Sequence, residues 1–182
     1  MLSGNDKPVA VVMGSDSDLG VMQGCVDMLR DFGIEPVVRI ISAHRNPRAA
    51  ADFAERAADN GIRVIIAAAG MAAHLAGAIA SRTILPVIGV PLVAGESLQG
   101  IDALLSTVQM PSGVPVATTA IGRTGAKNAA ILAVQILALS DPQLAAKLAQ
   151  FKHRLQKDVA EKNAALPEQD RKSSSSPSGK SD

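Results

Sequence analysis

The sequence is poor in aromatic residues, which make up 2% of its 182 residues, and it contains no Trp or Tyr. Proteins that bind single-stranded nucleic acid by stacking its bases need aromatic platforms, so that class is excluded. Lys and Arg number 18 against 17 Asp and Glu, and a formal net charge of +1 gives no basic field to attract a polyanion. We therefore expect no nucleic-acid partner.

Cysteine and long apolar runs are also scarce. Cys25 is the single cysteine, so an intrachain disulfide is impossible, and its apolar helical surroundings favour an inert core thiol over a reactive one. The sequence does not show the pattern of a signal peptide, in which a charged segment is followed by an apolar one. No apolar run approaches the roughly 18 residues of a membrane span. These features predict a cytoplasmic protein without a membrane partner.

What the chain does contain is 47% hydrophobic residues, mostly Ala, Val, Ile and Leu, arranged in short runs that alternate with helical patterns. Strands are predicted at 8–14, 35–41, 63–70, 85–91 and 114–121, and helices at 18–32, 47–60, from about 72, and within 96–110. Strict alternation implies parallel strands joined by helical crossovers. The predicted fold class is α/β, a three-layer α/β/α sandwich with a parallel sheet of the Rossmann or flavodoxin type.

Two further helices are predicted before the C-terminus. Residues 124–140 are apolar nearly all round, which indicates burial in the core or against another subunit. The next helix begins with Asp141 as N-cap and Pro142 in the first helical position, and its apolar stripe predicts packing; the stripe comprises Leu144, Leu148, Phe151, Leu155 and Val159. We predict one domain over residues 1–166 and a disordered serine-rich tail over 167–182.

Three strand-to-helix turns carry unusual residues, and all three should lie at the carboxyl edge of the sheet, where α/β proteins bind ligands. The first is GSDSD, from Gly14 to Asp18, whose serines and backbone N–H groups at a helix start suit a phosphate. The alternative is that Ser17 or Asp18 is only an N-cap. Two aspartates could also serve a divalent metal, but no further ligand follows at suitable spacing, so we predict none.

The second turn is SAHR, residues 42–45, before a helix that starts with Asn46 as N-cap and Pro47. Arg45 beside Ser42 suits an anionic oxygen group held by paired hydrogen bonds. His44 is the one side chain type that can both donate and accept a proton near neutral pH. The alternative is a surface histidine beside a surface arginine.

The third turn lies in AAAGMAAHLAG, residues 67–77, where small residues let a ligand ring approach the backbone. His74 falls in the first turn of the following helix, although a histidine among alanines can equally be structural. His153 lies among Lys and Arg in the last helix and is interpreted as solvated surface. The chain has no G-x-G-x-x-G after a strand, no H-E-x-x-H and no G-x-S-x-G, and GRTGAK does not match a phosphate-binding P-loop. The remaining hypothesis is that the protein binds a phosphorylated small molecule and that a histidine carries out a proton transfer on it.

Five motifs, in this order, resemble those of the N5-carboxyaminoimidazole ribonucleotide mutase family of purine biosynthesis, also described as the catalytic subunit of phosphoribosylaminoimidazole carboxylase. They are VVMGSDSD, SAHRNP, AAHLAG, LPVIGVP and LLSTVQMPSGVPVAT, and the resemblance spans roughly residues 8–160. It implies a Rossmann-like homo-octamer with active sites at subunit contacts and no cofactor or metal.

The resemblance also implies a reaction and a set of site residues. The substrate is a ribonucleotide that carries a carbamate on its exocyclic amine, and the enzyme moves the carboxyl group to carbon 4 of the imidazole. His44 resembles the catalytic histidine, which we expect to act as general acid and base on a sequestered CO2 intermediate. The phosphoribosyl contacts implied are Ser15, Asp18, Ser42 and Arg45, and the base and carboxylate pocket implied is Ala43, Gly70, His74 and Leu75.

The sequence departs from the family's usual G-A-G-G-A-A-H-L-P-G at Ala68, Met71 and Ala76. Leu19 and Asn46 replace a common tryptophan and threonine, and Asn46 is a neutral exchange because both residues cap helices. Met71 adds a flexible side chain beside the expected carboxylate pocket. Two alternatives therefore stand beside the mutase: a carboxylase that takes free CO2 or bicarbonate with aminoimidazole ribonucleotide, and a non-catalytic nucleotide-binding module, which would have no use for both His44 and His74.

Overall fold

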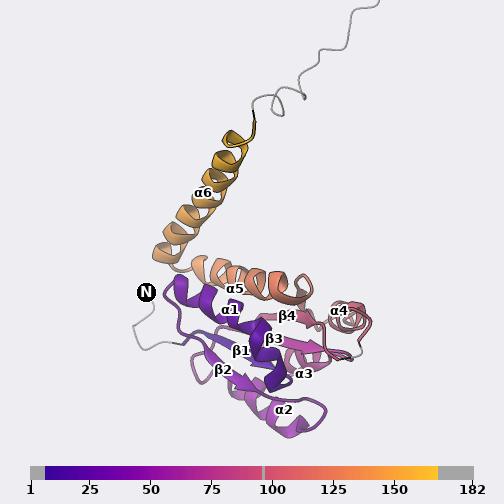
Figure 1. Ribbon diagram of the computed structural model, residues 1–182. Coiled ribbons are helices and arrows are strands. Elements are labelled where there is room, and N and C mark those ends of the chain that lie inside the picture. The colour runs from indigo at the N-terminus through magenta and orange to yellow at the C-terminus, as the bar shows by residue number, and fades with distance from the viewer. Residues whose placement is uncertain (1–6, 96, 168–182) are drawn as a thin grey trace, which may run out of the picture. The chain divides into compact units, whose positions relative to one another are not determined.

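The structure is a computed structural model that describes residues 7–95 and 97–167 (Figure 1). The chain has two compact parts, Met1–Ala145 and Ala146–Asp182, which are described separately. The predicted serine-rich tail lies outside the described residues, apart from Pro167. The prediction of a single domain up to residue 166 stays a prediction.

The first part is built on a five-stranded, fully parallel sheet in the order β2-β1-β3-β4-β5. The strands are β1 (Val9–Met13), β2 (Val37–Ile40), β3 (Val64–Gly70), β4 (Val87–Leu92) and β5 (Ala117–Thr118). This is the flavodoxin strand order, in which the chain moves outward in opposite directions from the β1–β3 pair. The predicted α/β fold class is confirmed.

Helices cover both faces of this sheet, as Figure 1 shows. On one face α1 (Leu19–Asp31) packs against α5 (Gly122–Ala138), and α5 also contacts β3 and β4. On the other face lie α2 (Pro47–Arg56) and α3 (Leu75–Ala80), which contact each other. Gly89 of β4 faces Ala76 of α3 and Thr107 of α4 (Ile101–Val108), so α4 covers the same face at this point.

Small aliphatic side chains fill the interior, as the lack of aromatic residues requires. All five residues of β1 and the first five of β3 are buried, which is typical of a parallel sheet covered on both faces. Alternate strand residues face the α2–α3 layer, and this side of the core comprises Ala10, Val12, Ile65 and Ala67 with Ala54, Ala57, Leu75 and Ile79. Alanine in strands and helices lets the layers approach closely and places the strand ends near the helix starts.

The helix predicted at 47–60 ends early, at Arg56, and three further predicted elements differ more clearly from the structure. The helix expected from about residue 72 begins at Leu75, because residues 71–74 form a tight turn. The helix expected within 96–110 begins at Ile101, since Gln99 and Gly100 both have positive φ angles, which an α-helix does not accommodate. The strand expected at 114–121 shortens to two residues after Pro115, which has no N–H to donate to a sheet.

The last helix, α6, spans Pro142–Ala164. Its predicted cap is confirmed, since the backbone N–H groups of Gln143 and Leu144 donate to Asp141 Oδ1 at 2.9 and 3.3 Å. In the predicted stripe Leu144 is buried, but Leu155 and Val159 are 45% and 67% exposed. Among the described residues, the chain has no helix with the length and hydropathy that crossing a bilayer requires.

Candidate active site

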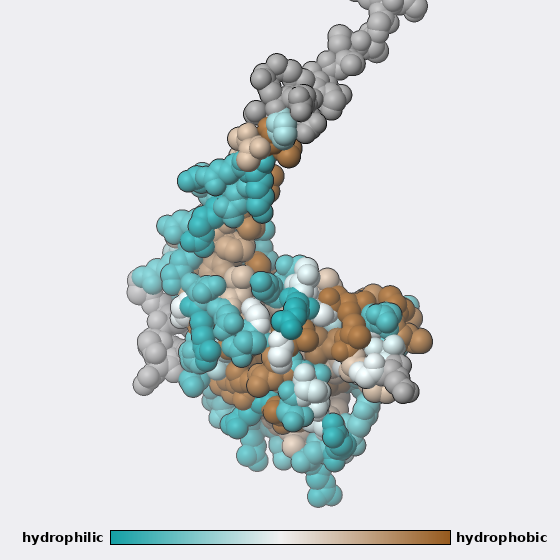
Figure 2. Space-filling model, viewed as in Figure 1, coloured by the Kyte–Doolittle hydropathy of each residue, from teal (hydrophilic) through white to brown (hydrophobic). Residues whose placement is uncertain are grey.

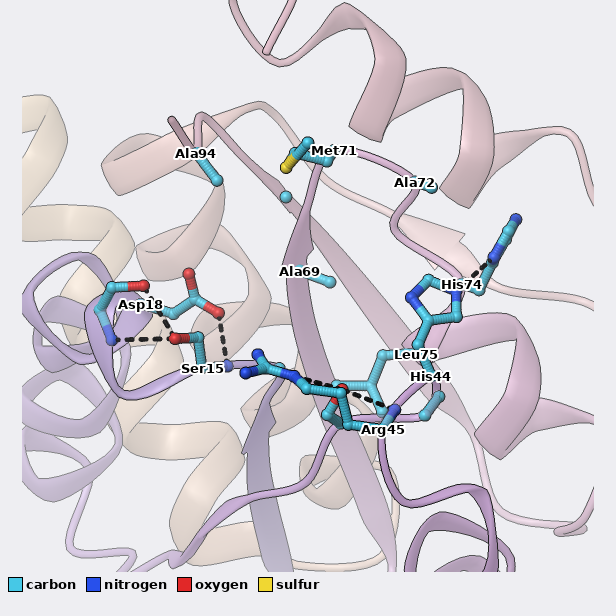
Figure 3. A pocket seen from close by; sticks show the side chains of 15 residues that line it. Ser15, Asp18, His44, Arg45, Ala69, Met71, Ala72, His74, Leu75 and Ala94 are labelled. Carbon is cyan, nitrogen blue, oxygen red and sulfur yellow. Dashed lines mark hydrogen bonds between the residues drawn. The ribbon is translucent and has the colours of Figure 1, made fainter. Parts of the chain in front are cut away.

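The carboxyl ends of β1, β2 and β3 meet at one edge of the sheet, and their turns surround a cavity of about 400 Å³. Figure 3 shows this cavity and its lining side chains. All nine residues predicted for the site line it: Ser15, Asp18, Ser42, Ala43, His44, Arg45, Gly70, His74 and Leu75. The topology therefore brings together the residues predicted for the site from three separate turns.

The first turn is organised by Ser15 and Asp18. The Ser15 N–H donates to Asp18 Oδ2 at 3.0 Å, and the Ser17 N–H donates to Ser15 Oγ at 3.4 Å, so the two residues form a capping box around the short helix 16–18. The N-cap alternative raised above named the wrong residue: Ser15 caps the short helix, and the Asp18 side chain makes no cap hydrogen bond to α1. Burial raises the pKa of the Asp18 carboxyl above its usual value, while backbone hydrogen bonds from Ser15 and Gly14 oppose that rise.

A second turn places Arg45 and His44 on the opposite side of the cavity. Both the backbone N–H and the side-chain Nε of Arg45 donate to Ser42 Oγ, at 3.2 and 3.4 Å, and Asn46 caps α2 through the Ala49 N–H as predicted. In Figure 3 the guanidinium group points toward the Ser15 turn. Within the described part of the chain Arg45 forms no ion pair, so its charge faces the cavity and is free to hold an anion.

His74 lies at the end of the third turn and touches His44. The distance from His44 Nε2 to His74 Nδ1 is 2.7 Å, and the rings meet edge to face with centroids 5.0 Å apart (Figure 3). A hydrogen bond between two ring nitrogens requires one to donate and the other to accept. If His44 Nε2 carries the shared proton, its Nδ1 keeps a lone pair that can accept a proton from a ligand.

Most of the remaining lining residues are small and apolar, and they include residues that were not predicted as site residues. Ala69 and Ala72 extend the third turn, and Ala94 arrives from the loop after β4. A Cβ on Gly70 would overlap the Cβ of Ala94, so this wall is closely packed. The signal for Ala94 was available in principle, because the loop after any parallel strand emerges at the same edge.

Cys25 does not line this cavity. Cys25 is fully buried and burial raises the pKa of its thiol to about 12, which confirms the inert core thiol. In the described ranges, no three His, Cys, Asp or Glu side chains are grouped as metal ligands would be.

The sequence was compared with those of known protein families and proteins. Residues 8–158 match the model of a protein family described as AIR carboxylase. The chain belongs to the AIR carboxylase family. Among its relatives in the AIR carboxylase family, an N5-carboxyaminoimidazole ribonucleotide mutase of Mycobacterium leprae is 55% identical over 158 residues, 87% of this chain and 91% of that protein. The mutase of Pyrococcus horikoshii is 51% identical over 165 residues, 90% of this chain and 92% of that protein.

The fold also resembles that of a solved structure. The crystal structure of Treponema denticola PurE superposes with a TM-score of 0.77 at 30% identity, covering 87% of this chain and 97% of that one. The stretch matched by the AIR carboxylase model contains every residue that lines the cavity. The resemblance inferred from five motifs is confirmed.

Proposed function

We propose that the protein is an N5-carboxyaminoimidazole ribonucleotide mutase, an isomerase of purine biosynthesis that moves a carboxyl group from N5 to carbon 4 of its substrate. The observation that carries this proposal is the His44–His74 contact of 2.7 Å in the same cavity as Arg45, which forms no ion pair with any of the described residues. Proteins of the same family that bear this activity in their names are 51% and 55% identical over most of the chain.

The charges in the cavity favour one orientation of the nucleotide. Arg45 and the hydroxyl of Ser42 hold the 5′-phosphate, since a guanidinium group donates paired hydrogen bonds to phosphate oxygens. Asp18 is buried, and a carboxylate repels phosphate but accepts hydrogen bonds, so with Ser15 it contacts the ribose. The imidazole then lies against Ala43, Gly70 and Leu75, with His74 and His44 beside it.

One histidine suffices to balance the protons of the reaction. His44 enters the reaction as the imidazolium. Cleavage of the carbamate C–N bond releases CO2, and the exocyclic nitrogen takes a proton from His44, which leaves its imidazole neutral. Carbon 4 then attacks the CO2 carbon, and His44 removes the proton that carbon 4 carried, which restores the aromatic ring. CO2 held in the small cavity reacts as if highly concentrated, so the second step needs no external carboxyl source.

The alternative, a carboxylase that takes free CO2 or bicarbonate, is not favoured by the names of the relatives. The two activities are separated by supplying each substrate alone and following 4-carboxyaminoimidazole ribonucleotide by NMR. The mutase should form product from N5-carboxyaminoimidazole ribonucleotide far faster than from aminoimidazole ribonucleotide with bicarbonate. Equal or reversed rates would support the carboxylase. No product from either substrate would support a non-catalytic nucleotide-binding module.

Replacing Arg45 with Ala should weaken nucleotide binding by about 10- to 100-fold, because a charge-assisted pair of hydrogen bonds is lost. The change is measured as the Kd for aminoimidazole ribonucleotide by calorimetry. Arg48→Ala, an exposed arginine one turn further along that does not line the cavity, is the matched control and should leave the Kd unchanged. If Arg45→Ala lowers only the rate and the Kd holds, the phosphate belongs elsewhere.

We also propose that the chain forms a homo-octamer with its sites near subunit contacts. Support comes from α4 and the loop before it, where Val93, Leu98, Ile101, Leu105 and Val108 are 49–71% exposed. Figure 2 shows them as an apolar area over α4, larger than isolated surface residues make. The burial predicted for α5, in the core or against another subunit, is found in the core, where α5 packs on α1 and the sheet. A contact of α5 with another subunit stays a prediction.

Sedimentation velocity checks the octamer, with an expected mass of eight times 18.7 kDa. Leu105→Asp should shift the protein toward smaller species, because burying a carboxylate in an apolar contact costs several kcal/mol, on the order of 3. A wild-type monomer in dilute buffer would contradict the assembly.

We also place the activity in the cytoplasm, because the buried reduced thiol of Cys25 suits that compartment. Recovery of the protein from another cell fraction would contradict this placement.

A further inference from the structure

Met71 has a backbone conformation that favours glycine. Its φ is 55°, and Gln99 is the other non-glycine residue with positive φ among the described residues. A side chain at such an angle is crowded by its own backbone. The turn is nevertheless held, because the Met71 carbonyl accepts the Ala73 N–H at 2.8 Å and Gly70 is pressed against Ala94. The turn therefore keeps its backbone conformation without help from the Met71 side chain.

The Met71 side chain lies at the mouth of the cavity. It is 54% exposed, and it lines the cavity next to Ala69, Ala72 and Ala94. In Figure 3 its sulfur points toward Ala94, across the end of β3. Of the lining residues in the described part of the chain, Leu75 is the other large apolar one, and Leu75 is 3% exposed. Met71 is thus the long, flexible apolar group placed between the cavity and solvent.

We propose that the Met71 side chain covers the apolar end of the cavity and retains CO2 between cleavage of the carbamate and attack by carbon 4. This inference rests on the proposed mutase function. CO2 is neutral, has no net dipole and is a poor hydrogen-bond acceptor, so charged groups and hydrogen-bond donors bind it weakly. Its escape is therefore limited mainly by what blocks its path. Met71 is suited to this position because a thioether chain adapts its shape to a small apolar guest and excludes water.

Isotope retention measures the escape of CO2. N5-carboxyaminoimidazole ribonucleotide labelled with 13C in its carbamate is supplied in excess unlabelled bicarbonate, with carbonic anhydrase present to exchange any CO2 that is released. The 13C content of the product carboxylate then gives the fraction retained. We expect Met71→Gly to raise the fraction of label lost by about tenfold over wild type and to accumulate free aminoimidazole ribonucleotide.

Two control variants distinguish the loss of the side chain that covers the cavity from an effect of the substitution on folding. Met71→Leu keeps an apolar chain of similar length and should retain label as wild type does. Gln99→Gly relieves the other positive φ outside the cavity and should change nothing in retention. Equal retention by wild type and Met71→Gly, with normal product formation, would overturn the role of Met71 and leave the mutase intact. Loss of label by wild type, or no product from wild type, would overturn both.

Discussion

His44→Asn is expected to lower kcat by about 10²- to 10⁴-fold and to leave the affinity for aminoimidazole ribonucleotide nearly unchanged. Asparagine fills similar space beside His74 and can still hydrogen-bond, but it cannot take or give a proton near neutral pH. The phosphate contacts proposed for Arg45 and Ser42 do not involve the imidazole ring. The loss should therefore fall on the rate and not on binding.

Single-turnover kinetics and calorimetry on the same preparation test this split between rate and affinity. His153→Asn is the matched control, because His153 is exposed on α6 and does not line the cavity. It should behave as wild type in both measurements. Turnover near the wild-type rate in His44→Asn would remove His44 from the chemistry, whereas a large loss of affinity would assign it to binding.

Gly125→Ala is expected to destabilise the fold by about 3 kcal/mol or more. Gly125 lies in the first turn of α5, and a Cβ there would overlap the carbonyl of Ala120 and come within 3.1 Å of Thr119 Oγ1. Ala120 lies two residues after β5 and two before α5, so relief would require moving backbone between the sheet and α5, which packs on β3, β4 and α1. Backbone yields less readily than a side-chain tip.

Urea unfolding at a fixed protein concentration measures the free energy of unfolding of this variant. Gly20→Ala is the control, since Gly20 lies on the exposed side of α1 and a Cβ there meets nothing within 4 Å. It should be neutral or stabilise by about 0.5–1 kcal/mol, because alanine loses less backbone entropy in a helix. A Gly125→Ala protein as stable as wild type would show that α5 can shift freely against the sheet.

Much of the fold could be predicted because its signals are local. The buried run of β1 and the Asn46–Pro47 start of α2 depend on a few neighbouring residues and appear as expected. The errors arose where backbone angles decide the outcome. Nothing in GMAAHL shows that Met71 has a positive φ and delays α3 to Leu75, and nothing near Gln99 shows the same for the start of α4.

The candidate site was predictable to the level of its turns, because parallel strands deliver their carboxyl ends to one edge. Which side chains touch across that edge was not. His44 and His74 are 30 residues apart, and their contact depends on the register of β3 beside β1 and β1 beside β2. Ala94 was missed because an alanine side chain does not mark a site residue, although its position after β4 placed it at the same edge.

We infer that the residues around His44 and His74 transfer a carboxyl group within the cavity. To test this transfer, the wild-type protein is supplied with N5-carboxyaminoimidazole ribonucleotide labelled with 13C in its carbamate, in excess unlabelled bicarbonate, and the isotope is read in the product. We expect the label to appear at the carbon 4 carboxylate. Product that carries unlabelled carboxylate from bicarbonate would contradict it.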